Sequence, residues 1–436
     1  MSRLLFVSYH FPPIGGGGVQ RVSKFVRYLP DFAVQPVVLT GPGESEYHWA
    51  PLDPTMVDEI PDVRVIRVPG PVPTSGHGRI GRLLGRPSAS TRWWIDSIVH
   101  FPREQGFTVD AILGELIPYE TAFGVQQLAT QLDVPWIADL QDPWALDEMW
   151  LYLSGVHRLA DRARMRSTLS SASAVVMNTP EAVARLRAAF PEFRERRVVA
   201  ITNGFDSADF LQMPPCRGDG IFRIVHSGYL HTDLGLRHRR AGRVRRLLGG
   251  MPIPGVDFLT RSHFYLLQAV EAVLQGAPSL RGVVQVHLVG AVTEQDREVA
   301  APYPFVRFHE YKPHAETISL LQTADLLFLP MQDLPFGVRA GLVPGKTYEY
   351  MASGVPILAA VPDGDARDML LSVGTAIVCR PSSVNCLADA LRQRIDAWRQ
   401  GAPRPQPNPA VLARFERRQL TSELAALIEE VVNDAR

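Results

Sequence analysis

The segment with the clearest chemical signature is Val343–Pro356, which reads VPGKTYEYMASGVP. Pro344 and Gly345 precede an expected helix, so Lys346 stands in its first turn. A helix dipole disfavours a cation at this end unless an anion, such as a diphosphate, is bound beside it. Glu349, one turn later, is placed to accept hydrogen bonds from a pair of ribose hydroxyls. The pattern indicates a nucleoside-diphosphate site, and the alternative is an exposed lysine and glutamate on a helix face.

A glycine-rich loop, Ile14–Arg21, follows the first expected strand. Its adjacent glycines, including Gly16 and Gly17, let the backbone approach a ligand, and the helix that follows favours an anion at its start. Arg21 stands where a dinucleotide-binding GxGxxG pattern needs its third glycine. The loop therefore favours a ligand contact other than a dinucleotide site, and the alternative is a flexible turn.

Four polar residues follow expected strands of the first half: His10, Glu115, Asp139 and Asp142. Carboxylates at such positions can orient an acceptor hydroxyl or take its proton. Asp142 precedes a proline and is also a good turn former, and His10 is as well explained as a satisfied polar group. The sequence shows no Ser-His-Asp arrangement and no metal-ligand spacing, so we expect no metal site.

These segments belong to a chain whose two halves repeat one pattern, in which short apolar β-rich runs alternate with helical patterns. Strands are expected at 4–8, 36–40, 63–66, 111–113, 136–138, 174–177 and 198–201, and then at 222–227, 284–289, 306–308, 326–329, 356–359 and 376–379. Helices are expected at 18–29, 119–132, 156–170, 264–275, 315–323, 346–353, 384–400 and 414–435.

This alternation predicts an α/β fold with two doubly wound, Rossmann-like domains. We place the first at residues 1–210 and the second at 211–412, with a helix at 413–436 packing across both. Sheets of this kind bind ligands at the C-terminal ends of their strands. The cleft between the two domains is therefore the expected site.

Composition narrows the class of protein. The 436 residues are 46% hydrophobic, and 45 Lys and Arg balance 45 Asp and Glu, so net charge gives no pull toward nucleic acid or membrane. No apolar run reaches the ~18 residues of a spanning helix. Three cysteines, Cys216, Cys379 and Cys386, with no CxxC, exclude a metal cluster and a disulfide framework. We therefore predict a reducing, cytoplasmic setting, with peripheral contact at the inner membrane face as an extension.

The segment around Lys346 resembles the donor-site helix of family-4 glycosyltransferases, which are retaining, two-domain GT-B enzymes. Further resemblances occur in family order at residues 12–18, 134–144, 201–206 and 324–330, and they cover nearly the whole chain. The resemblance implies a GT-B fold and transfer of a sugar from a nucleoside-diphosphate donor to a hydroxyl. Glycan, polysaccharide or glycolipid biosynthesis would be the setting.

The resemblance also implies roles for single residues. Lys346 would neutralise the donor diphosphate, and Glu349 would hold the ribose. The loop Phe336–Leu342 would offer backbone amides to the donor. The other donor-side residues are Gly16, Gly17, Gly337, Gly341, Leu342 and Tyr348, the candidate catalytic residues are Lys346, Arg261, Asp139 and Asp142, and the candidate acceptor contacts are Glu115 and His10. We expect no cofactor besides the nucleotide sugar, because cationic side chains would stabilise the leaving diphosphate.

Two departures from the family pattern concern the donor. Gly341 stands where the family commonly has the first glutamate of Glu-x7-Glu, so a sugar-hydroxyl contact is missing or supplied differently. The family's Gly-Arg…Lys-Gly phosphate pair is also absent after the strand at 222–227. Arg261 is the nearest substitute for its arginine.

An apparent insertion at 231–259 contains six arginines within Arg237–Arg246. These arginines suit anionic lipid headgroups or a phosphorylated acceptor, and the alternative is a solvated, partly disordered loop. The stretch Arg79–Arg86, with Trp93 and Trp94, mildly favours a membrane surface. Both tryptophans would otherwise be core, although a sugar-site floor is the other interpretation. Nucleic-acid binding is not expected, because no reading module accompanies the basic run.

Two other functions stay open at this stage. One is a GT-B sugar-nucleotide epimerase, which would need carboxylates placed for carbon deprotonation. The other is a non-catalytic nucleotide-sugar-binding partner protein, favoured by Gly341 and the missing arginine. The acceptor is equally open among a saccharide, a lipid-linked saccharide and a small metabolite.

Overall fold

A computed structural model of the chain describes residues 1–436 except 45–50, 61–62, 72–87, 106–107 and 213–217, and leaves the side chains of 102–105 and 241–246 undescribed. The chain forms two compact units. The first contains Met1–Gly204, Leu248–Pro252 and Arg417–Arg436, and the second contains Phe205–Leu247 and Ile253–Glu416. The stretch Arg79–Arg86 lies outside the described residues.

The first unit is built on a seven-stranded parallel sheet in the order β3-β2-β1-β4-β5-β6-β7. Its strands are β1 (Ser2–Ser8), β2 (Val34–Thr40), β3 (Arg64–Arg67), β4 (Ala111–Glu115), β5 (Trp136–Leu140), β6 (Ala174–Met177) and β7 (Val198–Ala200). The order reverses between β1 and β4, which creates the crevice where such sheets bind ligands.

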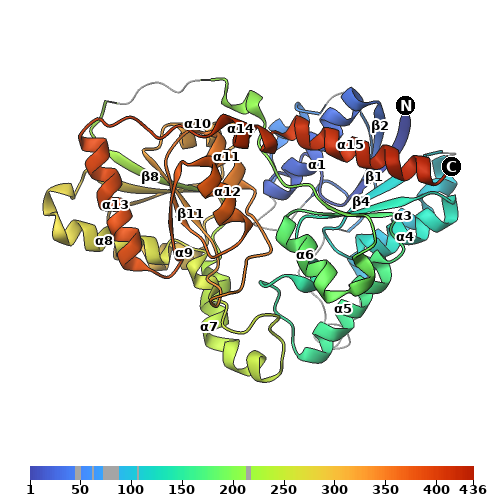
Figure 1. Ribbon diagram of the computed structural model, residues 1–436, viewed down its shortest axis with the longest axis horizontal. Helices are drawn as coiled ribbons and strands as arrows, with labels where there is room; N and C mark the ends of the chain where they lie inside the picture. The colour runs from blue at the N-terminus through green and yellow to red at the C-terminus, as the bar shows by residue number, and fades with distance from the viewer. Residues whose placement is uncertain (45–50, 61–62, 72–87, 106–107, 213–217) are drawn as a thin grey trace. The chain divides into compact units, whose positions relative to one another are not determined.

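Helices cover both faces of this sheet. They are α1 (Gly17–Tyr28), α3 (Ala89–Gln105), α4 (Thr121–Leu132), α5 (Gly155–Leu169), α6 (Pro180–Ala189) and α15 (Arg417–Asp434). One face packs with α1 and with α15, the expected C-terminal helix, drawn in red in Figure 1. The other face packs with side chains of α3, α4, α5 and α6.

The second unit is a six-stranded parallel sheet in the order β10-β9-β8-β11-β12-β13. Its strands are β8 (Phe222–Ser227), β9 (Val284–Val289), β10 (Val306–His309), β11 (Leu326–Pro330), β12 (Ile357–Ala360) and β13 (Ala376–Cys379). Its helices are α7 (Thr232–Leu247), α8 (Phe264–Gly276), α9 (Glu294–Ala300), α10 (His314–Gln322), α11 (Lys346–Ala352), α12 (Asp365–Val373), α13 (Val384–Arg399) and α14 (Pro409–Leu412). A core of β-strand side chains with α8 and α13 fills one face.

Each predicted strand is present in the structure, which confirms the doubly wound α/β prediction. Among the described residues, six helices were not predicted: α3, α6, α7, α9, α12 and α14. Two of them, α9 and α12, have only seven and nine residues, too short for an apolar period to be distinguished from a loop.

The Arg-rich insertion is largely the helix α7, so the alternative of a disordered loop is wrong for this segment. Arg237 forms an ion pair with Asp233 one turn earlier, and Arg239 binds both Asp257 and the hydroxyl of Tyr265. These pairs give two of the arginines partners within the second unit.

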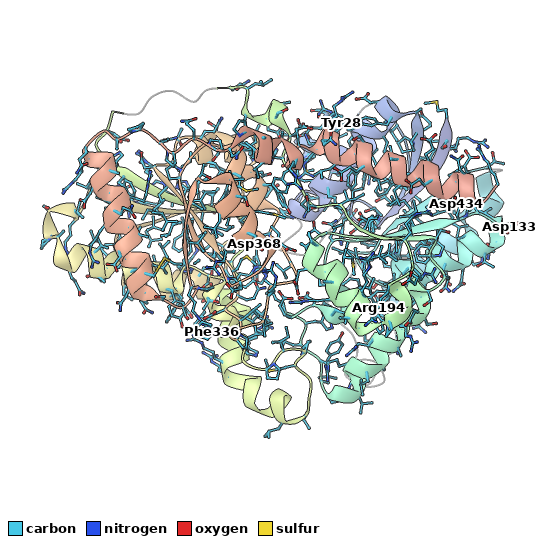
Figure 2. All side chains as sticks on the ribbon, in the orientation of Figure 1. Tyr28, Asp133, Arg194, Phe336, Asp368 and Asp434 are labelled. Atoms are coloured by element: carbon cyan, nitrogen blue, oxygen red, sulfur yellow. A yellow bond between two sulfur atoms is a disulfide. The ribbon has the colours of Figure 1, made fainter. Side chains whose placement is uncertain are left out.

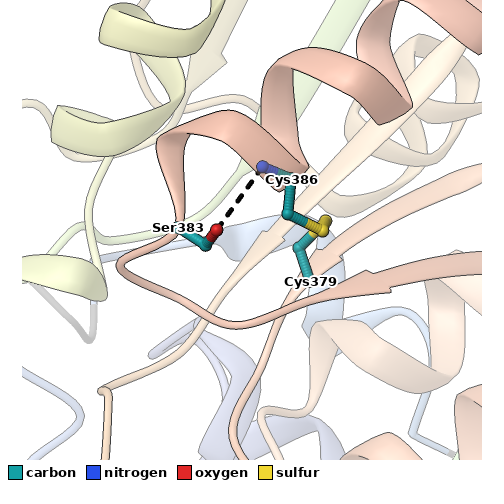
Figure 3. Close-up of a disulfide and its surroundings, with 3 residues drawn as sticks. All are labelled: Cys379, Ser383 and Cys386. Atoms are coloured by element: carbon teal, nitrogen blue, oxygen red, sulfur yellow. Dashed lines mark hydrogen bonds between the residues drawn. A yellow bond between two sulfur atoms is a disulfide. The ribbon is translucent and has the colours of Figure 1, made fainter.

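The structure also joins Cys379, at the end of β13, to Cys386 in the first turn of α13 as a disulfide, with their Cα atoms 5.8 Å apart (Figure 3). Ser383 caps this helix by accepting the backbone N–H of Cys386. The number and spacing of the cysteines predicted no disulfide framework and a reducing setting, so this bond was not expected from the sequence. A tight strand-to-helix turn brings the two cysteines together, and spacing alone does not reveal such a turn.

None of the helices in the described part of the chain combines the length and the apolar composition that a membrane span needs.

Candidate functional site

The candidate donor site of the second unit centres on Lys346, the first residue of α11. Its Nζ donates to Nε2 of His226, 3.2 Å away. Nδ1 of His226 donates to the carbonyl oxygen of Phe328 in β11, at 3.0 Å. Because that proton sits on Nδ1, Nε2 is the free acceptor that Lys346 uses. The imidazole therefore links the amine to β11, a central strand of the sheet, through two hydrogen bonds.

Burial sets the protonation of this pair. Burial, followed by the charge of Arg261, lowers the pKa of Lys346 to about 7, and the charge of Glu349 opposes both effects. Burial and then the charge of Lys346 hold the pKa of His226 well below its ordinary value. The amine of Lys346 is therefore partly desolvated and lies beside a neutral imidazole. A bound anion would favour the charged form of this amine.

The turn after β8 leaves space for Lys346. Gly228 has a φ of +92°, and a Cβ there would lie 2.9 Å from Nζ of Lys346. Its N–H bonds the carbonyl of Val289, and the N–H of Ser227 donates to the hydroxyl of Tyr350 in α11 at 2.8 Å. Glycine is required at position 228, because any side chain would displace the amine.

Arg261 brings a second cation to the same part of the unit. It follows the short helical turn Phe258–Thr260, and its carbonyl accepts the N–H of His231. Its guanidinium Nη1 lies 3.4 Å from Oε1 of the buried Gln332. Arg261 and Lys346 both lower the pKa of His231, after the larger effect of burial. Two basic side chains from separate segments of the chain thus act on the turn that contains His231.

Glu349 lies one turn along α11, where its Oε1 is 3.0 Å from Nε2 of His314 in α10. The side chain of Glu349 is 17% exposed, and that of His314 is 13% exposed. Tyr348 is fully buried and packs against Phe415, with ring centroids 5.5 Å apart. The structure therefore leaves Glu349 partly accessible, while Tyr348 belongs to the core.

The loop 336–342 begins at an exposed aromatic residue. Phe336, labelled in Figure 2, is 87% exposed. The guanidinium of Arg380 lies over its ring, 3.9 Å from the ring centroid. Gly337 has a φ of +79°. Gly341 and Leu342 are buried, behind a backbone bridge from Ala340 to Gly364.

Asp333 anchors the start of this loop. Its Oδ2 accepts from Nε of Arg380 at 3.0 Å and from Oγ of Ser382 at 2.6 Å. Its backbone pairs with that of Asp257, the cap of the turn that ends at Arg261. Asp333 therefore connects the loop after β11 to the loop after β13 through its carboxylate, and to the turn that carries Arg261 through its backbone.

In the first unit, Glu115 and Asp139 lie opposite each other at the ends of β4 and β5. Asp139 forms a buried bidentate pair with Arg21 of α1, at 3.0 Å from Nε to Oδ2 and 2.8 Å from Nη2 to Oδ1. Arg21 also donates to the carbonyl of Thr202. Both side chains are 1% exposed. Arg21, at the missing third glycine, thus fastens α1 to the sheet.

Glu115 lies in a buried network. Its oxygens face Oγ of Ser8 at 3.1 Å and Nε2 of Gln141 at 3.0 Å. Burial, followed by the charge of Asp139, raises the pKa of Glu115 to about 8. Because Ser8 also donates to the carbonyl of His10 at 2.9 Å, a protonated Glu115 can donate to Ser8 in turn. Burial lowers the pKa of His10 to about 4, so this imidazole is neutral.

Asp142, Gly16 and Gly17 are the remaining predicted site residues of the first unit. Asp142 is half-buried, and its charge raises the pKa of Tyr119, after the larger effect of burial. Gly16 caps α1 with a φ of +96°, which requires glycine. A Cβ on Gly17 would meet no atom within 4 Å, so that backbone is open to a ligand.

The tryptophans at 93 and 94 contribute to packing. Trp94 is 1% exposed and donates from Nε1 to Thr121, and Trp93 packs against the same core. Among the described residues, no group of three His, Cys, Asp or Glu side chains is placed to hold a metal ion.

Sequence reasoning missed three participants: His226, Gly228 and His314. His226 lies inside an apolar strand run and His314 opens a short helix, so neither shows a pattern of its own. Gly228 was visible only as part of the segment that departs from the family.

Comparison with known protein families gives two matches, one in each half of the chain. The family model "Glycosyl transferase 4-like domain" matches residues 16–204, and "Glycosyl transferases group 1" matches residues 258–397. Together they cover about three quarters of the chain. No curated protein matches the sequence.

Solved structures share the whole fold at low identity. The Anabaena protein HepE in complex with UDP and glucose is 16% identical, with a TM-score of 0.59, over 99% of this chain and 100% of that one. Sucrose-phosphate synthase from Thermosynechococcus elongatus is 16% identical, with a TM-score of 0.60, over 100% and 97%. UDP-GlcNAc 2-epimerase from Methanocaldococcus jannaschii is 10% identical, with a TM-score of 0.52, over 98% and 99%.

These likenesses confirm the two-domain GT-B fold. Both domain matches name the same class of protein, and they fall on the two units that the structure separates. The chain therefore contains two glycosyltransferase domains, a glycosyl transferase 4-like domain in its first unit and a glycosyl transferases group 1 domain in its second.

Proposed function

We propose that the protein is a retaining glycosyltransferase that moves a sugar from a nucleoside-diphosphate donor to a hydroxyl acceptor. The observation that carries this proposal is the amine of Lys346 held on His226, with Arg261 acting on the same turn. A desolvated cation without a bound anion is costly, and a diphosphate would supply the missing negative charge. Glu349 is assigned to the ribose, because its carboxylate is partly accessible one turn away.

The difficult step is departure of the diphosphate. As the bond from the anomeric carbon to the phosphate oxygen breaks, negative charge grows on that oxygen, and Lys346 and Arg261 would stabilise it. The acceptor oxygen then bonds the same face of the carbon. Its proton passes to the departing phosphate, which would account for retention without a second carboxylate nucleophile.

To the first unit we assign the acceptor. Asp142 is the half-buried carboxylate best suited to orient a hydroxyl. Asp139 is committed to Arg21, and we assign it a positioning role. Glu115, with its raised pKa, is assigned as a neutral hydrogen-bonding group near the end of β4.

A sugar-nucleotide epimerase is the second candidate, because the fold is shared with a UDP-GlcNAc 2-epimerase. Turnover separates the candidates. A transferase yields free nucleotide and a glycoside, an epimerase yields an altered donor, and a non-catalytic partner protein yields neither.

The first experiment is a thermal-shift panel with UDP, GDP, ADP and dTDP. A ligand present at ~100 times its dissociation constant adds about 2.7 kcal/mol to stability, which is readily visible. We expect one nucleotide to raise the melting temperature of the parent protein. The same nucleotide should not raise the melting temperature of Lys346→Ala. Lys312→Ala is a matched control, since this lysine lies in the same unit and pairs with Glu316 at the surface. The absence of a shift with any of the four, on folded protein, would contradict the proposal.

A further inference from the structure

The turn Gly228–His231, which follows β8, contacts both basic residues of the candidate donor site. At its start, the backbone of Gly228 approaches Lys346 so closely that a Cβ there would lie 2.9 Å from Nζ of the lysine. At its end, the N–H of His231 donates to the carbonyl oxygen of Arg261 at 3.1 Å. The turn therefore links the segments that carry Lys346 and Arg261.

The imidazole of His231 has one enclosed and one accessible ring nitrogen. Its side chain is half-buried, and Nδ1 is enclosed without a hydrogen-bond partner among the residues that the structure describes. The ring of Tyr229 meets the imidazole edge to face, with the centroids 5.1 Å apart. The carbonyl of His231 accepts the N–H of Gly235 at 2.8 Å, so the backbone here is fixed by the start of α7. Nε2 is the ring nitrogen that a ligand can reach.

The surroundings of His231 decide where its proton sits. Burial is the largest cause that lowers the pKa of His231 well below its ordinary value, so the imidazole is neutral. Arg261, Lys346 and His226 act on this pKa in the same direction. A neutral imidazole carries one N–H. On Nδ1 that proton would be buried without an acceptor, which is costly, whereas on Nε2 it can bond water or a ligand. The ring therefore presents an Nε2–H donor.

An anion is the ligand that suits this turn. The charges that act on His231 are basic, and the two nearby carboxylates already have partners. Asp233 pairs with Arg237 at 2.7 Å, and Asp296 accepts from the hydroxyl of Thr232. A phosphate oxygen accepts hydrogen bonds from ammonium, guanidinium and imidazole groups alike. A neutral imidazole also adds a donor without adding a further positive charge to the free site.

The order of the side chains indicates which part of the donor His231 meets. Glu349 acts on the pKa of Lys346, and Lys346 acts on that of His231. Under the proposed function, Glu349 holds the ribose and Lys346 holds the diphosphate. His231 then stands at the far end of this series, beside the phosphate that is more distant from the ribose.

We propose that Nε2 of His231 donates a hydrogen bond to the distal phosphate of a nucleoside diphosphate. The inference rests on the proposed function and deepens it. His231 becomes a specificity residue, because a nucleoside monophosphate lacks the group that it binds. As the bond to the anomeric carbon breaks, the electron pair moves to an oxygen of this same phosphate, and a fixed donor there stabilises the growing charge.

The test is isothermal titration of the full chain with three probes. They are the nucleoside diphosphate that the thermal-shift panel selects, its monophosphate, and inorganic pyrophosphate. H231A should weaken diphosphate binding about tenfold or more, the loss expected for one hydrogen bond to a charged group. Monophosphate binding should stay nearly unchanged. The matched control is H287A, because the half-buried ring of His287 in β9 bonds Gln285 and His309, and it should bind the diphosphate as the parent protein does.

Two further variants identify the nitrogen that acts. The amide nitrogen of glutamine can occupy the position of Nε2, whereas that of asparagine corresponds to Nδ1. We therefore expect H231Q to keep most of the diphosphate affinity and H231N to bind as weakly as H231A. Misfolding would not explain this order, since asparagine is the better residue at a helix N-cap. Thermal melts of all variants verify that they are folded.

Several outcomes would overturn the inference. They are unchanged diphosphate affinity in H231A, equal losses for the diphosphate and the monophosphate, or full binding by H231N with a loss in H231Q. Diphosphate binding that Lys346→Ala abolishes and H231A leaves intact rejects the role of His231 alone. If no nucleotide binds the parent protein, the proposed function fails. Pyrophosphate then decides separately, because binding that H231A weakens supports the phosphate contact, and any other result rejects it.

Discussion

Lys346 and His226 come from α11 and β8, 120 residues apart in the chain, and they share a hydrogen bond of 3.2 Å between an amine and a neutral imidazole. The imidazole is fixed by its bond to Phe328, so the position of the amine is set by the sheet. Burial, and after it the charge of Arg261, lowers the pKa of this lysine to about 7. A bound anion would therefore favour the charged form of this amine.

We predict that nucleoside-diphosphate binding takes up protons at Lys346. With a pKa of about 7 in the free protein, this amine is mostly neutral at pH 8, and a bound diphosphate restores its charge. The affinity should therefore fall by up to about tenfold per pH unit above 7. Calorimetry in two buffers of different ionisation enthalpy measures the uptake, expected at close to one proton at pH 8. Lys346→Arg is the control, because arginine stays charged. Equal heats in both buffers would show that Lys346 is already charged.

Gly228→Ala should reduce both stability and nucleotide affinity. The residue has a φ of +92°, and its new Cβ would lie 2.9 Å from Nζ of Lys346. The backbone alone costs about 1–2 kcal/mol, and the amine must also move. Gly374→Ala separates the two effects, since its φ is +84° but a Cβ there meets no atom within 4 Å. Thermal denaturation should show a loss in both variants, while isothermal titration should show weaker binding only in Gly228→Ala.

Glu115→Gln should change the pH dependence of stability. The folded-state pKa of Glu115 is raised to about 8, so between pH 4.5 and 8 the folded protein binds a proton that the unfolded chain releases. Stability therefore falls as pH rises through this window, by up to about 1.4 kcal/mol per unit. Glutamine cannot ionise, so the stability of the variant relative to that of the parent protein should increase as the pH rises from 5 to 8. Denaturant melts at several pH values measure the difference, and parallel curves would contradict the raised pKa.

The sequence was sufficient for the architecture because parallel strands buried on both faces are continuous apolar runs, such as Leu326–Pro330. Lys346 and Glu349 could be predicted because they stand on one short helix with characteristic turn residues. His226 could not, since its role depends on an amine 120 residues away. Arg21 illustrates the same limit. The sequence showed only that it breaks a glycine pattern, and its pairing with Asp139 depends on how α1 packs.

Reduction of the disulfide between Cys379 and Cys386 should destabilise the second unit and weaken its donor loop. The bond closes a loop that contains Arg380 and Ser382, the two partners of the Asp333 carboxylate. Loop-closure entropy at this length is worth about 2.5 kcal/mol, or about 5–10 °C in melting temperature.

The measurement is a melt with and without a thiol reductant, together with nucleotide titrations. C379A/C386A is the control, and it should melt near the reduced protein and ignore the reductant. An unchanged melting temperature on complete reduction, verified by thiol titration, would show that the loop keeps its form without the bond.

Asp139→Asn and Asp142→Asn should separate structure from catalysis. Asparagine at 139 leaves the buried guanidinium of Arg21 without its charged partner, and breaking such a pair costs about 3–5 kcal/mol. Replacing the whole pair, as in R21M/D139L, should recover part of that loss, because no charge is then left buried. Asp142 is half-buried, so Asp142→Asn should change stability little and lower kcat in a transfer assay by about 10²-fold or more. If instead Asp139→Asn folds normally and abolishes turnover, the carboxylate at 139 reacts with the acceptor and Arg21 tunes it.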